Sequence, residues 1–212
     1  MDVDVAQYLG RLAKIYGEIG QEYDKAAGKY GGFSCEGCTD NCCTTVFHHH
    51  TLIENLYLIE GFEGLDVKKK EEAVIRAKKY VEELSDHPFD MTELSIMCPL
   101  NVEGKCEAYE YRPLICRIHG MPGILHSPKG TKEFDGCPVF MEQHGNSISH
   151  RIDRTSFYTD IAFIERDLRE EMVFTEKHRK TIAEMIVDYT RDEITLSKRL
   201  RPEDFHKDSH II

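Results

Sequence analysis

The segment Cys35-Glu36-Gly37-Cys38-Thr39-Asp40-Asn41-Cys42-Cys43 contains half of the eight cysteines of this chain. The other four follow further along the chain, as Cys98, Cys106, Cys116 and Cys137. A chain that brings several thiolates into one small volume usually holds a metal with them. We therefore expect residues 33–140 to form a cysteine-rich metal-binding core.

The spacing inside this cysteine-rich segment (residues 35–43) supports ligation and leaves the number of sites open. Cys35 and Cys38 form a Cys-x-x-Cys pair that can place two thiolates on one ion, and Cys42 extends the run towards iron–sulfur spacing. Because adjacent side chains diverge, Cys42 and Cys43 either serve two sites, or one ligates while the other packs or reacts. Eight thiols can fill two four-thiolate sites, or four of them can fill one.

The composition favours a soluble globular domain. The chain has 212 residues, of which 41% are hydrophobic and 31% charged, enough for one apolar core. A formal net charge of −11 argues against a general nucleic-acid surface and against docking on anionic membranes. No apolar run is long enough to span a bilayer, and the first residues lack the features of a signal peptide.

We therefore expect a cytoplasmic protein. Cytoplasmic thiols stay reduced, which favours metal binding or redox chemistry over structural disulfides. The simpler interpretation, a set of inert buried thiols, suits a scattered cysteine better than the spacing of residues 35–43.

Helical periodicity predicts amphipathic helices on both sides of the core, in residues 1–27 and 152–200. Apolar residues recur at helical spacing over Val5 to Tyr23, and later at Phe157, Ile161, Ile164 and Leu168, and at Ile182, Met185, Ile186 and Tyr189. The tail after Arg201-Pro202 is polar, and we expect it to fray.

Two more helices are expected within the core. Thr51 and Glu54 predict a capping box for a helix from Leu52 to about Ile59. Asp66 predicts the cap of a helix from Val67 to Leu84, closed by Pro88. The expected buried stripe of this second helix is Val67, Val74, Ala77, Val81 and Leu84.

The later cysteines fall in shorter elements. Residues 96–106 predict a short hairpin with Asn101 to Gly104 as its turn. Pro113 suits the first turn of a helix that carries Cys116. Residues Gly120 to Gly136 are rich in Gly and Pro and predict a loop.

These motifs, in this order, resemble the YkgJ-type cysteine-cluster family, whose signature is written CxxCxxCC and which is described as a zinc- or iron-chelating domain. The resemblance covers about residues 33–118: the run from Cys35 to Cys43, Cys98-Pro99-Leu100, Cys106-x2-Tyr109 and Arg112-Pro113-x2-Cys116-Arg117. One departure is the three residues between Cys38 and Cys42, where the signature has two. The resemblance implies chelation without specifying a reaction. A similar cluster occurs in flagellin lysine N-methylases.

A thiolate-bound metal centre carries negative charge, which nearby residues must offset. Four thiolates around Zn²⁺ or around a [4Fe–4S]²⁺ cluster leave a net negative charge, which nearby donors and cations must offset. Arg112 and Arg117 flank Cys116 and are candidates for this role, the alternative being surface ion pairs. His48-His49-His50 and His119 are candidate nitrogen ligands, the alternative being exposed or loop histidines.

We predict a single, mainly α-helical domain over residues 1–212, built around a cysteine-rich metal core with a short β-hairpin. The expected metal ligands are Cys35, Cys38, Cys42, Cys43, Cys98, Cys106, Cys116 and Cys137. With only one Cys-x-x-Cys pair, the spacing favours an iron–sulfur cluster, [4Fe–4S] above others, with a redox or accessory role and a protein or redox partner. A zinc-binding structural or interaction module and a mononuclear iron site are alternatives, and an enzyme that modifies a protein or small molecule rests on the methylase analogy.

Overall fold

The computed structural model describes residues 3–34, 42–87 and 94–191, and within these ranges the chain is mainly helical. Its α-helices are α1 (Val5–Lys29), α2 (Leu52–Glu63), α3 (Val67–Ser85), α4 (Leu114–Ile118), α5 (Pro138–His144), α6 (Thr155–Met172) and α7 (Ile182–Thr190). Single turns of 3-10 helix are η1 (Cys42–Thr44), η2 (Tyr109–Tyr111) and η3 (Gly145–Ser147). The predicted mainly α fold class is confirmed. None of the described helices is both long and apolar enough to cross a membrane.

The strands are short and form two small sheets. They are β1 (Asn101–Val102), β2 (Lys105–Cys106), β3 (Gly123–Ser127), β4 (Gly130–Phe134) and β5 (Ile152–Asp153). β1 and β2 form the predicted hairpin, with Asn101 paired to Cys106. In the second sheet β3 lies between antiparallel β4 and parallel β5.

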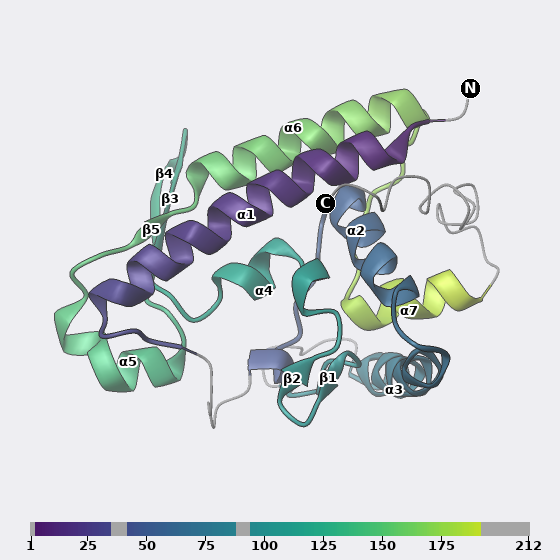
Figure 1. The fold of residues 1–212 in the computed structure, drawn as a ribbon, viewed down its shortest axis with the longest axis horizontal. Helices are drawn as coiled ribbons and strands as arrows, with labels where there is room; N and C mark the ends of the chain where they lie inside the picture. Colours follow the sequence, from purple (N-terminus) through teal and green to yellow (C-terminus); the bar gives the residue numbers. More distant parts are fainter. Residues whose placement is uncertain (1–2, 35–41, 88–93, 192–212) are drawn as a thin grey trace.

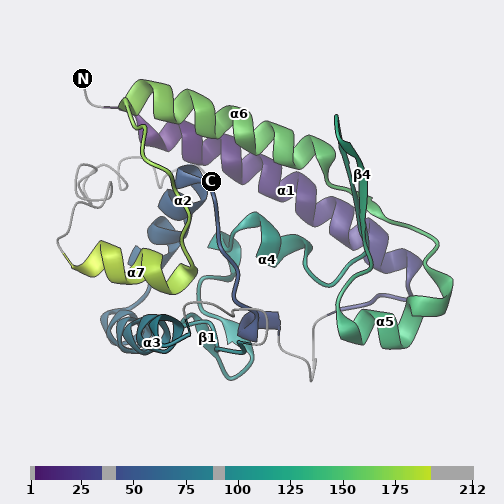
Figure 2. The ribbon, with the colours of Figure 1, turned by 180° about the vertical axis from the view of Figure 1, so that it is seen from behind.

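α1 and α6 lie side by side along the length of the molecule (Figures 1 and 2). The apolar stripe predicted for the first helix is buried from Val5 to Ile19, and the four stripe residues of α6 are buried as well. Together with α4 and α5 they form the first core cluster, whose central residues are Leu12, Tyr16, Ile19, Ile53, Ile118, Phe140, Ile161 and Leu168. α1 continues beyond the predicted end at Tyr23 to Lys29.

A second core cluster lies where α3 and α7 pack against the end of α2 and the β1–β2 hairpin. Its members are Leu58, Phe62, Ala73, Ala77, Tyr80, Ile96, Leu100, Ala108, Ala183, Met185, Ile186 and Val187. Four of the five residues of the stripe predicted for α3 face the second cluster: Ala77 is buried, and Val74, Val81 and Leu84 are half-buried and pack against it. The prediction is wrong at Val67, which is 68% exposed, and it missed the buried residues Ala73 and Tyr80.

The capping box predicted for α2 does not form. The Thr51 hydroxyl donates to the Glu54 carboxylate, and the Thr51 side chain accepts no backbone N–H of the first turn. Instead the carboxylate of Glu165, on α6, accepts the N–H groups of Leu52 and Ile53, both at 2.9 Å. A carboxylate at a helix N-terminus is favoured by the helix dipole, so a tertiary contact replaces the local cap. The cap predicted at Asp66 is confirmed, with Lys69 N donating at 2.9 Å.

The loop predicted from Gly120 to Gly136 is wrong, because β3 and β4 form a hairpin there. Most of its side chains are exposed or half-buried, so the segment lacks the alternation of apolar and polar residues that marks a strand. Arg154 joins the sheet to the preceding segment: its backbone N–H donates to the carbonyl oxygen of Ile124 in β3 at 2.8 Å, and its Nη2 donates to those of Ile118 (3.2 Å) and Met121 (2.8 Å). A Cβ at Gly123 would lie 2.1 Å from Arg154 Nε, so glycine is required for this approach.

Some predictions fall outside the described residues. They are the helix end at Pro88, the polar tail after Arg201 and the part of the C-terminal flank beyond residue 191.

Candidate metal centre

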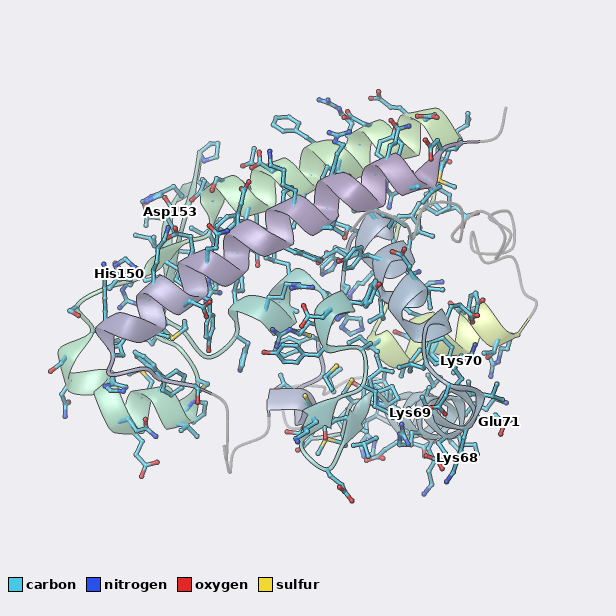
Figure 3. The ribbon with its side chains drawn as sticks, viewed as in Figure 1. Lys68, Lys69, Lys70, Glu71, His150 and Asp153 are labelled. Atoms are coloured by element: carbon cyan, nitrogen blue, oxygen red, sulfur yellow. The ribbon has the colours of Figure 1, made fainter. Side chains whose placement is uncertain are left out.

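Five cysteines from five separate segments line one cavity of about 630 Å³. They are Cys43 in η1, Cys98 before β1, Cys106 in β2, Cys116 in α4 and Cys137 at the N-cap of α5. Several sulfur atoms, drawn in yellow, gather beside η1 and the β1–β2 hairpin in Figure 3. Cys137 belongs to the first core cluster, whereas Cys98 and Cys106 pack against the second. The cavity therefore lies where the two clusters meet.

Backbone pairing brings Cys43 to Cys98, although the two are far apart in sequence. The N–H of Cys98 donates to the carbonyl oxygen of Cys43 at 2.8 Å, and the N–H of Ile96 donates to that of Thr44 at 2.9 Å. An antiparallel bridge between Thr45 and Ser95 continues this pairing. These contacts fix the end of the cysteine-rich segment against residues 95–98, which lead into the hairpin.

Local turns aim backbone amides at two of the sulfurs. The N–H groups of Leu100 and Asn101 hydrogen-bond to the Cys98 sulfur, and the N–H of Ala108 to the Cys106 sulfur; each bond acts to lower the pKa of its thiol. Such bonds stabilise the thiolate form and orient it, which is how proteins prepare cysteine ligands for a metal. A thiol that only fills space has no need of them.

Without a cation these thiols are neutral. Removal from water raises the pKa of Cys98 to about 12, and it raises the pKa of Cys106 and Cys116 as well. The charges of Cys43, Cys98 and Cys106 raise the pKa of Cys116 further, so all four lie close enough to sense one another. Several thiolates can share such a place only when a metal supplies positive charge. The set of donors therefore fits a thiolate-bound metal.

The cavity wall is positive in an acidic protein. Among the described residues that line it there is no Asp or Glu, whereas Lys105 and Arg112 both contribute. The charge of Arg112 lowers the pKa of Cys106. Its guanidinium stacks over the ring of Tyr109 at 3.5 Å, and its buried Nε has no hydrogen-bond partner among the described residues. Arg112 therefore takes the place beside the thiols that the sequence predicts.

Arg117, the other predicted arginine, is not among the residues that line the cavity. Its guanidinium stacks over the ring of Tyr16 at 3.9 Å, and its Nε donates to the carbonyl oxygen of Arg112 at 2.8 Å. Arg117 thus binds the backbone of Arg112 and does not itself reach the cavity. Lys105, which directly precedes Cys106, also lines the cavity but is exposed, and the sequence reasoning did not name it.

Two of the candidate histidines line the cavity. His49 is 4% exposed and exchanges backbone hydrogen bonds with Lys180 at 2.8 and 3.0 Å. His119 also lines it, and its ring contacts Phe47 with the centroids 5.4 Å apart. His50 is exposed, and His48 Nδ1 lies 3.4 Å from Arg179. Only the middle residue of the His48–His50 run reaches the cavity.

The remaining predicted ligands, Cys35 and Cys38 and the side chain of Cys42, lie outside the described part of the chain. In residues 3–34, 42–87 and 94–191, no three His, Cys, Asp or Glu side chains form a group that could hold an ion. The structure thus brings the described cysteines to one cavity and does not place them around a single point.

Comparison of the chain with protein-family models, with curated proteins and with solved structures finds no match. The resemblance to the YkgJ-type family therefore stays a prediction that rests on the motifs quoted above.

Proposed function

We propose that the protein binds a metal cofactor through cysteine thiolates, in the form of a [4Fe–4S] cluster with a redox or accessory role. The observation that carries this proposal is that Cys43, Cys98, Cys106 and Cys116 line one cavity, with backbone amides directed at two of their sulfurs. Cys35, Cys38, Cys42 and Cys137 complete the set of candidate ligands.

The size of the cavity favours a cluster over a single ion. A structural zinc site is closed, with four ligand atoms in contact with one ion. Here the thiols lie, with other residues, along the wall of a cavity of about 630 Å³, which has room for several metal atoms and their bridging sulfides. Arg112, whose charge lowers the pKa of Cys106, would offset part of the negative charge that such a centre carries.

The chemistry that a cluster supplies is the transfer of one electron at a time. The chain's own groups then determine its potential, because hydrogen bonds to the sulfurs and nearby cations stabilise the more negative, reduced state. The amides of Leu100, Asn101 and Ala108 and the guanidinium of Arg112, which lower the pKa of Cys98 and Cys106, would have this effect on a bound cluster. We propose a cytoplasmic setting and a redox partner protein.

A zinc-binding structural or interaction module is the second candidate. Cys98 and Cys106 lie at the two ends of a short hairpin, each with an amide-to-sulfur hydrogen bond, and this arrangement also suits a zinc ion.

Anaerobic purification separates the two. A cluster predicts brown protein with thiolate-to-iron absorption in the visible, together with iron and acid-labile sulfide in equal amounts. Colourless protein with stoichiometric zinc would contradict the cluster and support the second candidate. The double variant Cys98→Ser/Cys106→Ser, prepared in parallel, controls for adventitious metal. Wild-type protein that holds neither metal would overturn both.

A further inference from the structure

The buried carboxylate of Glu54 accepts hydrogen bonds from three different residues. It lies in the first turn of α2 and is 7% exposed. Its Oε1 accepts the hydroxyl of Tyr16 at 3.0 Å and the backbone N–H of Leu114 at 2.7 Å. Its Oε2 accepts the hydroxyl of Thr51 at 2.5 Å. One side chain thus joins α1, the start of α2 and the start of α4.

The bond to Leu114 matters because Leu114 opens α4, the element that carries Cys116. α4 spans only Leu114–Ile118, and a helix this short has too few internal hydrogen bonds to hold its own position. The burial of Leu114 and Ile118 in the first core cluster holds α4 against α1, and polar contacts fix its two ends: Glu54 binds the N–H of Leu114, and Arg154 binds the carbonyl oxygen of Ile118.

Glu54 is also near enough to act on the thiol through its charge, which raises the pKa of Cys116. Positive charge lies further out, since the guanidinium of Arg117 stacks on the Tyr16 ring whose hydroxyl binds Glu54. Removal of a buried carboxylate would leave the Leu114 N–H and the Tyr16 hydroxyl without their acceptor.

We propose that Glu54 is a positioning residue of the metal centre: by holding the first residue of α4, it fixes the Cys116 sulfur at the cavity. This inference rests on the proposed function. The hydrogen bonds of the Glu54 side chain go to Tyr16, Thr51 and Leu114, so it acts on Cys116 through the backbone of α4.

Glu165 provides a matched control. It too is buried, at 9% exposure, and its carboxylate also accepts backbone N–H groups at the start of a helix. Those N–H groups belong to Leu52 and Ile53, directly before Glu54 in α2. Loss of Glu165 removes these two bonds but leaves the bonds of Glu54 to Leu114 and Tyr16 in place, so it should cost stability and leave Cys116 protected.

The test compares Glu54→Ala, Glu54→Gln and Glu165→Ala with the wild type, all purified anaerobically with their metal. Each protein is treated with iodoacetamide while folded, and alkylation of Cys98, Cys106 and Cys116 is followed separately by peptide mass spectrometry. Iron and zinc are measured on the same samples. Bound metal protects its cysteine ligands, so the rate at each cysteine reports on that ligand alone.

We expect Cys116 in Glu54→Ala to react about 10-fold faster than in the wild type, with Cys98 and Cys106 still protected. Glu54→Gln should restore protection, because the amide oxygen still accepts from Leu114 and Tyr16. Glu165→Ala should lower the thermal midpoint and leave Cys116 protected.

Three results would overturn the inference: unchanged protection of Cys116 in Glu54→Ala, loss of protection at all three cysteines together, or the same Cys116 exposure in Glu165→Ala. Metal in the wild type combined with any of these refutes the role of Glu54 and leaves the proposed function standing. Wild-type protein without metal refutes both.

Discussion

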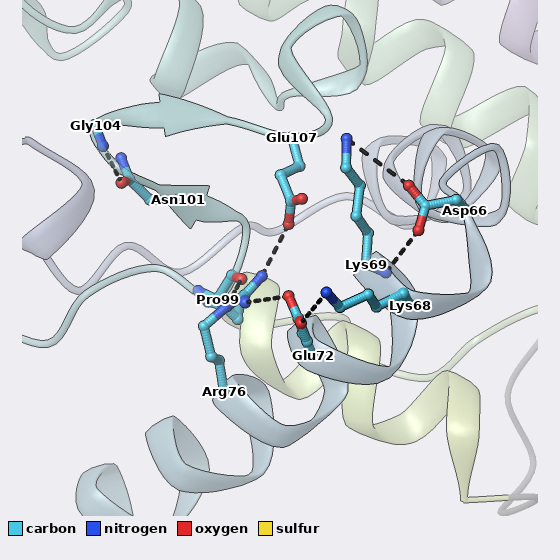
Figure 4. A network of polar contacts seen from close by, with 9 residues as sticks. All are labelled: Asp66, Lys68, Lys69, Glu72, Arg76, Pro99, Asn101, Gly104 and Glu107. Atoms are coloured by element: carbon cyan, nitrogen blue, oxygen red, sulfur yellow. Dashed lines mark hydrogen bonds and ion pairs between the residues drawn. The ribbon is translucent and has the colours of Figure 1, made fainter.

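The guanidinium of Arg76 and the carboxylate of Glu107 lie 2.8 Å apart and join α3 to the segment that follows β2 (Figure 4). Arg76 Nε also donates to the carbonyl oxygen of Pro99 at 2.7 Å. The Arg76 side chain thus binds Pro99, directly after Cys98, and Glu107, directly after Cys106. The hairpin that carries these two cysteines is anchored to a long helix at both of its ends.

Arg76→Ala should therefore loosen the cysteine hairpin. The Glu107 side chain is only 10% exposed, so the variant leaves a half-paired carboxylate and should lose about 2 kcal/mol of stability. Metal affinity should fall about 10-fold, measured by competition with a chelator. Lys68→Ala is the control on the same helix, because the Lys68–Glu72 pair is exposed and 3.8 Å apart (Figure 4). Equal affinities for the two variants would contradict the anchoring role.

Cys98→Ser should lose metal and stability together, because ligation is coupled to folding. A serine hydroxyl is a poor substitute for a thiolate that receives two amide hydrogen bonds. The measurement is metal content alongside the thermal midpoint. Met97→Leu is the control, since Met97 is 43% exposed and adjacent in sequence. Full metal retention in Cys98→Ser would remove Cys98 from the ligand set.

Two glycine substitutions should act in opposite directions. A Cβ at Gly61 would lie 2.2 Å from Tyr111 Cγ, so Gly61→Ala should displace the Tyr111 ring and cost about 1–3 kcal/mol. A Cβ at Gly17 meets nothing within 4 Å, so Gly17→Ala should stabilise α1 by about 0.5–1 kcal/mol. Thermal unfolding of both variants checks the pair, and a destabilised Gly17→Ala would show that α1 is more crowded than described.

Acid should destabilise the fold through buried histidines. His178 is 5% exposed, and burial lowers its pKa to about 4; burial also lowers the pKa of His49 to about 4. The unfolded chain binds these protons near pH 6.5 and the folded chain does not, so stability is present above pH 6.5 and is lost as the pH falls towards 4. Each histidine contributes on the order of 3 kcal/mol at most.

His178→Gln should remove one of these contributions and so reduce the slope of unfolding free energy between pH 6.5 and 4, as followed by urea denaturation. His87→Gln, at an exposed position, is the control. A slope that does not change in His178→Gln would mean that His178 titrates normally in the folded protein.

Periodicity predicted the helices well where a helix packs on one broad apolar face. The stripe from Val5 to Ile19 and the stripe of α6 are buried as expected. It was less accurate in α3, where it missed the buried Ala73 and included the exposed Val67, because alanines carry little hydrophobic signal. It failed for the β3–β4 hairpin, whose mostly exposed side chains show no alternation.

The candidate site was predictable as a set of cysteines but not as an arrangement. Sequence order cannot show that Cys43 pairs with Cys98, since that contact is a backbone hydrogen bond between distant segments. Nor could it place Glu54, whose spacing from Thr51 matches a capping box although its carboxylate serves Tyr16 and Leu114. A sequence motif indicates hydrogen bonds between residues that are close in sequence. The Cys43–Cys98 bond and the Glu54–Leu114 bond join residues that are far apart in sequence, so no local motif indicates them.

The two core clusters have a consequence for the order in which the protein is made. The first needs α6 and the second needs α7, and both helices follow every cysteine of the chain. A ribosome delivers residues from the N-terminus onward, so all eight thiols are synthesised before either core can close. The nascent chain thus holds all of its cysteines in water while the two helices that complete the cores around the described ones are still being translated.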